Sequence, residues 1–191
     1  MPSETVYEVH LDLAKFFDCI DRQQLISKIK ALVEPEHIKN TPTLSSNSNK
    51  NHLDKLLESF YNWDWDEESP ELYKAVCATG ENTTIPKGIP QGLVAGGFLA
   101  NIYMLDFDAW FNELIGKDLA ENIHLVDYSR YVDDMRLIVI AKSDKNAADV
   151  KKLIEEKINE QLSGLKLTLN KEKTVVERFT PKRGGISQKL N

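Results

Sequence analysis

Cysteine, histidine and long apolar runs are scarce in this sequence, and each shortage excludes a class of protein. Its 2 cysteines, Cys19 and Cys77, form no framework of disulfides and suit a reducing compartment, although the count alone allows one bridge. The 4 histidines are scattered without the spacing of metal ligands, which argues against a zinc site. No apolar run is long enough to cross a bilayer and no signal peptide is visible, so we expect a cytoplasmic protein with no membrane partner.

Positive charge is also in deficit. The chain has 24 Lys and Arg against 30 Asp and Glu, a net charge of -6, and a pI near 5.3. By itself, such a balance argues against nucleic acid as a partner. The apolar share of 41% and the length of 191 residues are nonetheless ordinary for one globular domain with a real core. We therefore expect residues 1–191 to form a single domain.

Alternating apolar and polar residues predict the strands. Residues 5–13 alternate in this way, which predicts a strand with Asp12 on its polar face near the carboxyl end. Residues 123–132 and 135–141 are typical of two strands joined in a tight hairpin. A last strand is expected over residues 173–179.

Apolar side chains at three- and four-residue spacing predict the helices. Asp21, with Gln24 three residues later, forms a capping box, so a helix is expected to begin just after Asp21. Residues 34–51 are polar and rich in Ser and Asn, which favours a mobile loop. Further helices are expected over residues 52–63, 96–115 and 144–162.

The order of these elements indicates the fold. Without an insertion at about residues 35–80, the order is strand, helix, strand, strand, helix, strand. This is the split βαβ arrangement of ferredoxin-like domains, an α+β fold in which helices cover an antiparallel sheet. The first strand and the hairpin can then lie side by side. Such a sheet would bring Asp12 together with Asp133 and Asp134 at one edge.

Three carboxylates at one point repel one another unless cations neutralise them. Hard oxygen ligands suit Mg²⁺, and two such ions can stabilise both the attacking and the leaving oxygen of a phosphoryl transfer, with Mn²⁺ able to substitute. The implied chemistry is nucleotidyl transfer, with Asp12, Asp133 and Asp134 as catalytic metal ligands. Taken alone, however, two aspartates at a hairpin are more typical of an exposed turn.

Four motifs occur together and in order. They are "HLDLAKFFDCID" at residues 10–21, "IPQGLVAGGFLANIYM" at 89–104, "YVDD" at 131–134 and "GLKLTLNKEKT" at 164–174. As a set they resemble the palm of a reverse transcriptase, an RNA-directed DNA polymerase, especially the bacterial group that includes group II intron, retron and abortive-infection enzymes. The resemblance covers most of the chain apart from residues 35–80.

The resemblance implies roles for residues at the matching positions. Asp12 and Asp133 match the principal metal ligands of the family, and Asp134 matches the aspartate that supports the site and the primer end. Phe17 matches the bulky residue that lies under the incoming sugar and excludes a 2′-hydroxyl. The sequence leaves open whether Phe16 or Phe17 faces the site, because either ring could belong to the core.

Further matches concern the substrates. Gln91 matches a residue that touches the nucleotide and template, and Gly92 allows a close approach of the backbone. Tyr131 is expected beside the primer terminus and Lys173 near the triphosphate. The partners implied are an RNA template, a DNA or RNA primer and deoxynucleoside triphosphates. Without the resemblance, these residues would indicate only a turn, a packed aromatic side chain and a solvated charge.

Two features depart from the family pattern. Gly96 and Gly97 stand where the family has Ser, often followed by Pro, so the role of this turn is open. Little sequence precedes the first catalytic strand, so we expect the fingers and thumb regions of a parent protein to be absent and the fragment to polymerise little alone. The acidic balance then has a cause, because phosphate-binding Lys and Arg would lie mostly on the absent regions.

Two other functions remain open. One is a related enzyme, either a template-independent nucleotidyl transferase of the abortive-infection type or a nucleotide cyclase. Cyclases lack the Pro-Gln-Gly segment, and a transferase would extend a primer without any template. The other is a non-catalytic palm scaffold, against which the intact Asp12, Asp133 and Asp134 argue.

Overall fold

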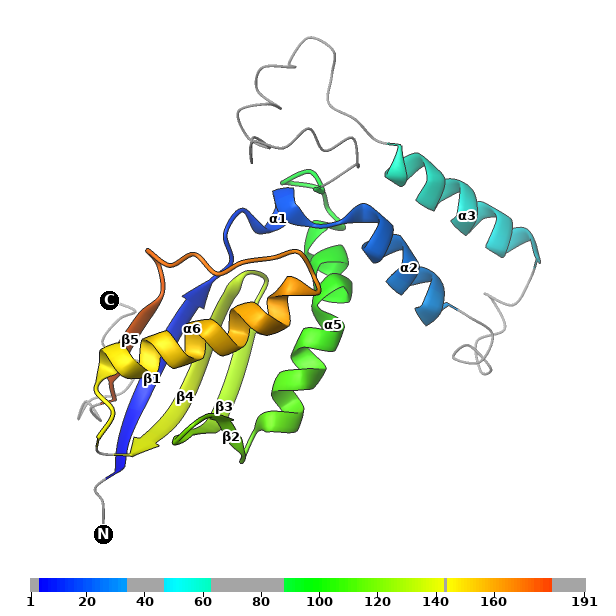
Figure 1. The fold of residues 1–191 in the computed structure, drawn as a ribbon. Helices are drawn as coiled ribbons and strands as arrows, with labels where there is room; N and C mark the ends of the chain where they lie inside the picture. Colours follow the sequence, from blue (N-terminus) through cyan, green and yellow to red (C-terminus); the bar gives the residue numbers. More distant parts are fainter. Residues whose placement is uncertain (1–3, 34–46, 63–87, 143, 180–191) are drawn as a thin grey trace, which may run out of the picture. The chain divides into compact units, whose positions relative to one another are not determined.

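The structure, a computed structural model, describes residues 4–33, 47–62, 88–142 and 144–179 (Figure 1). The chain divides into two compact units. The sheet unit comprises residues 1–13, 110–160 and 169–191, and the helical unit comprises residues 14–109 and 161–168. Within the described ranges, no helix combines the length and the apolar character needed to cross a bilayer.

One antiparallel sheet dominates the sheet unit. In chain order, its strands are β1 (Glu4–Asp12), β2 (Asp118–Ala120), β3 (Ile123–Tyr131), β4 (Asp134–Lys142) and β5 (Val175–Arg178). They lie side by side in the order β2-β3-β4-β1-β5, and these pairings are antiparallel. Without the short β2, this is the strand order of the split βαβ arrangement. The predicted α+β fold class is therefore confirmed.

The alternation in β1 decides which face of the sheet is covered. Tyr7, Val9 and Leu11 are buried, whereas Glu8 and His10 between them are half-buried. Strand β4 has the same pattern, with buried side chains at every second position: Met135, Leu137, Val139 and Ala141. A slip of one residue would turn each of these apolar side chains to the other face, so the alternation also determines the register.

Helix α6 (Ala147–Ser163) lies across the sheet in Figure 1 and supplies apolar cover. Its inward side chains include Val150, Ile154 and Ile158, which are fully buried. The last turn of helix α5 (Gly96–Leu114) adds Phe111, whose ring stacks on Tyr128 of β3 with 4.0 Å between the ring centroids.

The helical unit contains α1 (Phe16–Cys19), α2 (Arg22–Leu32), α3 (Asn47–Tyr61) and the first part of α5. Helix α2 begins where the sequence predicts, because Asp21 is its N-cap and accepts a hydrogen bond from the Gln24 backbone N–H at 3.0 Å. The reciprocal half of the predicted capping box is wrong. The backbone N–H of Asp21 donates instead to the hydroxyl of Tyr103, at 3.3 Å.

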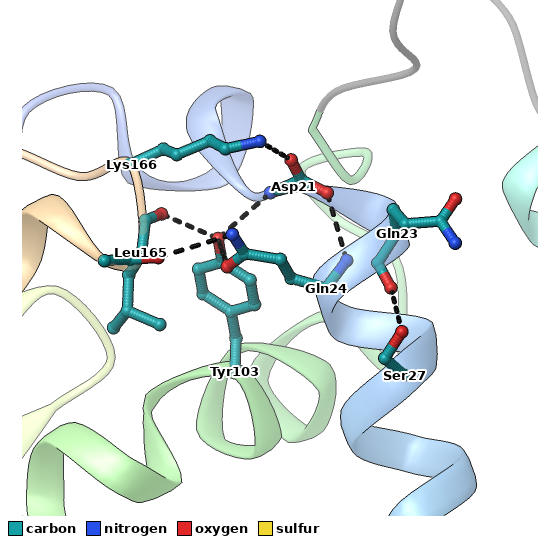
Figure 2. A network of polar contacts seen from close by, with 8 residues as sticks. Asp21, Gln23, Gln24, Ser27, Tyr103, Leu165 and Lys166 are labelled. Carbon is teal, nitrogen blue, oxygen red and sulfur yellow. Dashed lines mark hydrogen bonds and ion pairs between the residues drawn. The ribbon is translucent and has the colours of Figure 1, made fainter.

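Tyr103 is the centre of a polar network in this unit (Figure 2). Its hydroxyl donates to the backbone oxygen of Leu165 at 2.7 Å and lies 3.2 Å from Oε1 of Gln24. Lys166, the next residue, forms an ion pair with Asp21. Burial alone would raise the pKa of Asp21, but the hydrogen bonds from Lys166 and from the Gln24 backbone outweigh it and hold that pKa below its ordinary value.

Some elements differ from the predictions. Helix α3 begins at Asn47, inside the stretch 34–51 that was predicted to be a loop, because Asn and Ser are well tolerated at the start of a helix. Strand β2 was not predicted, since three residues are too few to show an alternating pattern. Cys77 and most of the insertion at residues 35–80 lie outside the described residues.

Candidate active site

A groove of about 730 Å³ lies on the sheet unit, where β1, β3, β4 and β5 meet the segment before β5. Four of the predicted site residues line it, namely Asp12, Tyr131, Asp134 and Lys173. Asp12 and Asp134 are directly opposite each other in the pairing of β1 with β4. The sheet register therefore brings the first motif and the hairpin motif to the same place, as the element order predicts.

The hairpin itself has a strained turn. Tyr131 and Asp134 form the last pair of β3 and β4, so Val132 and Asp133 make the connection. Val132 has a φ of 59°, an uncommon backbone conformation for a β-branched residue. Arg130 supports the turn, because its Nη1 donates to the backbone oxygen of Val132 at 2.7 Å.

The three aspartates influence one another electrostatically. Burial raises the pKa of Asp133 above its ordinary value, and the negative charges of Asp12 and Asp134 raise it further. Lys173 offsets part of this charge, since its Nζ lies 3.0 Å from Oδ2 of Asp12. That contact in turn raises the pKa of Lys173 above its ordinary value.

The donor chemistry of these residues fits a hard divalent cation, because carboxylate oxygens are the ligands that Mg²⁺ prefers. Burial is the first cause of the raised pKa of Asp133, and the negative charges of Asp12 and Asp134, which a cation would offset, add to it. Over the part of the chain that the structure describes, however, no three His, Cys, Asp or Glu side chains come close enough together to hold a metal ion. The ligand set of Asp12, Asp133 and Asp134 thus stays a prediction.

Phe17, Gln91 and Gly92 belong to the helical unit. Phe16 is buried, whereas Phe17 is only half-buried, so Phe17 is the accessible ring of the two. A Cβ placed on Gly96 would lie 3.7 Å from the Phe17 ring, so the residue that departs from the family pattern lies against this aromatic side chain.

Gln91 and Gly92 are exposed and form the centre of a turn. The Leu93 backbone N–H donates to the Pro90 oxygen at 3.4 Å, and Gly92 has a φ of 84°, as a type II turn requires. Nothing in the protein lies within 4 Å of a Cβ placed on Gly92. The backbone conformation, rather than a close neighbour in the chain, therefore accounts for this glycine.

Other residues of the groove were missed from the sequence. His10 and Arg136 are paired across β1 and β4, and both contact the Glu8 carboxylate, at 2.9 Å from Nε2 and 3.4 Å from Nη1. The alternation in β1 does place His10 on the same face as Asp12. Its pairing with Arg136 depends on the register between two strands far apart in sequence, which no local pattern reveals.

Comparisons with known proteins find one family match and several similar structures. The chain matches the family model "Reverse transcriptase (RNA-dependent DNA polymerase)" over residues 3–184. Among solved structures, it is similar to apo telomerase from Candida tropicalis truncated from the C-terminal domain, with a TM-score of 0.50 and 19% identity over 96% of this chain and 32% of that one. A comparison with curated protein sequences finds no match.

Two further telomerase structures, each in complex with the TWJ fragment of telomeric RNA, are also similar. The Candida tropicalis structure has a TM-score of 0.53 and 17% identity, covering 97% of this chain and 27% of that one. The Candida albicans structure has a TM-score of 0.52 and 18% identity, covering 94% and 28%. This chain thus spans a third or less of these telomerases, and the likeness shows the fold alone. The family match over residues 3–184 shows that the chain belongs to the reverse transcriptase (RNA-dependent DNA polymerase) family.

Proposed function

We propose that this chain catalyses template-directed nucleotidyl transfer as the palm of an RNA-directed DNA polymerase. The observation that carries the proposal is the pairing of Asp12 with Asp134 at a groove, in a chain that belongs to the reverse transcriptase family. Phosphoryl transfer requires little covalent chemistry from the protein, and its rate comes mostly from positioning and charge stabilisation. Carboxylates at the junction of two strands suit that task.

Each residue has a part in this proposal. Asp12, Asp133 and Asp134 hold Mg²⁺ ions, for which Mn²⁺ can substitute. When bound, such ions stabilise the charge that develops on the attacking and leaving oxygens. Tyr131, whose side chain is exposed beside Asp134, positions the primer terminus, and Lys173 approaches the triphosphate.

The residues of the helical unit act on the sugar and the base. Phe17 excludes a 2′-hydroxyl, since its ring is accessible while Phe16 is buried. Gln91 and Gly92 contact the nucleotide and the template through an exposed turn. The substrates in this proposal are an RNA template, a DNA or RNA primer and deoxynucleoside triphosphates. The residues of the four motifs favour the bacterial group of group II intron, retron and abortive-infection enzymes over other branches of the family.

The proposal can be tested by extension of a 5′-labelled DNA primer on an RNA template, at low salt with Mn²⁺ or Mg²⁺ and one deoxynucleotide at a time. We expect slow addition of the nucleotide that matches the template. Loss of a partner of a metal ligand costs about 10- to 100-fold. Loss of a ligand itself in Asp133→Asn should therefore reduce the rate roughly a hundredfold or more.

Asp144→Asn is a matched control, because Asp144 is an exposed aspartate of the same unit and lies outside the groove. It should extend the primer as the wild type does. Addition without a template would instead favour the template-independent transferase. No addition by the wild type, or equal addition by Asp133→Asn, would contradict catalysis by this chain and favour a scaffold.

A further inference from the structure

The segment that carries Lys173 is held firmly to the sheet unit. Asn170 is its anchor. The backbone N–H of Asn170 donates to the backbone oxygen of Asp12 at 2.8 Å, and the backbone oxygen of Asn170 accepts from the backbone N–H groups of Lys173 and Thr174. Helix α6 holds both ends of the segment. Asn159 accepts from the Leu169 backbone N–H at 3.0 Å, and Lys151 Nζ donates to the Thr174 oxygen at 2.7 Å.

This anchoring separates a fixed backbone from a movable side chain. The Lys173 side chain is 64% exposed, whereas the Asp12 side chain that it contacts is 11% exposed. Asp12 therefore has little access to water, and a protein partner or a bound cation at its carboxylate offsets the cost of burying it. Lys173 can move its ammonium into solvent at small cost, since a flexible four-carbon stem joins it to the backbone. Of the two partners, the lysine is the one that can leave.

The ammonium occupies one of the two carboxylate oxygens of Asp12 that a cation could take. Oδ2 of Asp12 is the atom that Lys173 contacts, and the neighbouring charges of Asp133 and Asp134 also act on this lysine. An ammonium and a divalent ion cannot both approach the same carboxylate oxygen without repelling each other. Binding of one must therefore weaken binding of the other.

We propose that Lys173 is an exchangeable counter-ion of the carboxylate site. It neutralises Asp12 until a divalent ion binds, and it is then released toward the groove, which it also lines. The released ammonium is thereby available to an anionic group of a bound substrate, in the same event that completes the cation site. This inference rests on the proposed function, because it assumes that the aspartates take a divalent ion.

The test is a titration of the wild type and of Lys173→Gln with Mn²⁺ alone. The electron paramagnetic resonance signal of the free ion measures how much Mn²⁺ stays unbound. Exposed ion pairs are worth at most about a factor of five in an equilibrium. We therefore expect Lys173→Gln to bind Mn²⁺ roughly two- to fivefold more tightly than the wild type. Lys173→Arg keeps the charge and should resemble the wild type. Lys171→Gln makes the same change of charge two residues away and should alter the affinity much less.

A second measurement does not depend on the binding assay. In EDTA, Lys173→Gln should melt at a lower temperature than the wild type, because Asp12 loses its partner. Saturating Mn²⁺ should narrow that difference, since a ligand that binds more tightly stabilises the folded state by a larger free energy at the same concentration. The Lys171→Gln protein should keep the same difference from the wild type in both conditions.

The outcomes separate the inference from the proposed function. Equal or weaker Mn²⁺ binding by Lys173→Gln, with binding by the wild type intact, would overturn the exchange and leave the polymerase proposal standing. An equal gain from Lys171→Gln would also overturn it, because the effect would then be one of net charge. If the wild type binds no Mn²⁺ at all, both the exchange and the metal site of the proposed function fail.

Discussion

Asp12, Asp133 and Asp134 carry the same side chain in unlike surroundings. Asp12 is buried at the end of β1 and has the ammonium of Lys173 as a partner, whereas Asp134 is exposed at the start of β4. Asp133 lies in the turn, where burial and then its two neighbours raise its pKa. Burial and the two neighbouring charges thus make the ionised form of Asp133 costly in the folded chain.

This cost predicts a dependence of stability on pH. Because the pKa of Asp133 in the folded chain is above the ordinary value of 3.8, the folded state binds this proton more tightly than the unfolded state does. The contribution of Asp133 to stability is therefore most favourable below pH 3.8 and falls as the pH rises through the folded pKa. Asp133→Asn removes the charge, so in EDTA at pH 7 it should melt at a higher temperature than the wild type.

Thermal melts between pH 4 and pH 7 would measure this effect. The difference between Asp133→Asn and the wild type should shrink as the pH falls toward 4. Asp144→Asn, at an exposed position, should follow the wild type throughout. The prediction is contradicted if Asp133→Asn melts below the wild type at pH 7, or if the difference between the two melting temperatures does not change with pH. Either result would show that the turn needs this carboxylate for another reason.

Phe17 permits a prediction on the choice of sugar. If its ring occupies the space of a 2′-hydroxyl, Phe17→Ala should raise the use of ribonucleotides relative to deoxyribonucleotides by roughly tenfold or more, because a steric exclusion is removed. Single-nucleotide extension with matched dNTP and NTP would give the ratio. Phe98→Ala, which truncates an exposed aromatic side chain of α5, is the control. An unchanged ratio in Phe17→Ala would assign the exclusion to another residue.

At the scale of elements, α1 and α2 are held by residues distant in sequence. The Gly88 N–H donates to the Ile20 oxygen at 2.7 Å, and the Ile89 N–H donates to the Phe17 oxygen at 2.9 Å. These two hydrogen bonds join the backbone of residues 17–20 to residues 88 and 89, which lie shortly before Gln91 in the chain. Tyr103 then connects α5 to the N-terminus of α2 and to the residues after α6 (Figure 2).

Tyr103→Phe should therefore destabilise the fold out of proportion to the single atom removed. The change leaves the Leu165 oxygen and the Asp21 N–H without their hydroxyl partner, and an unsatisfied buried polar group costs about 1–3 kcal/mol. Urea unfolding would measure the loss. Tyr131→Phe removes the same atom from a side chain that is 81% exposed, so its free energy of unfolding should stay within about 0.5 kcal/mol of the wild type.

Gly88 and Gly92 provide a matched pair for the close approach of chain segments. Both have positive φ, but a Cβ on Gly88 would lie 3.0 Å from the Asp18 oxygen, whereas one on Gly92 would meet nothing within 4 Å. Gly92→Ala should cost about 1–2 kcal/mol for the backbone conformation alone. In urea unfolding, Gly88→Ala should lose clearly more free energy of unfolding than Gly92→Ala. Equal losses would show that the backbone around Asp18 moves away from the new Cβ at no cost.

For the whole molecule, the net charge of -6 opposes binding of a nucleic acid duplex at long range. Only a few cations line the groove, among them Arg130, Arg136 and Lys173. Each phosphate contact adds about -0.9 to the slope of log affinity against log salt, so this chain should show a slope no steeper than about -3. Fluorescence anisotropy with an RNA–DNA duplex would measure it, and Arg136→Gln should reduce it by about one. A steeper slope would reveal a cationic surface elsewhere.

The sequence by itself determined the strands other than β2, most helices and the order of the motifs. Periods of two and of 3.6 residues depend only on backbone geometry and on which side chains avoid water, so β1, β4 and α6 could be predicted from neighbouring residues. The N-cap at Asp21 could be predicted for the same reason, because its partner lies three residues away. The meeting of Asp12 with the hairpin could also be predicted, since the element order allowed one sheet.

Only the tertiary structure decided which distant side chains touch. The contact of Lys173 with Asp12 and the pairing of His10 with Arg136 depend on register, rotamer and loop path. Tyr103 displaced Gln24 from the Asp21 N–H because α5 brought a buried hydroxyl there, which outweighs a local preference. Phe17 became the accessible ring because Phe16 was taken into the core. Such choices rest on packing between segments far apart in the chain, and no local pattern records them.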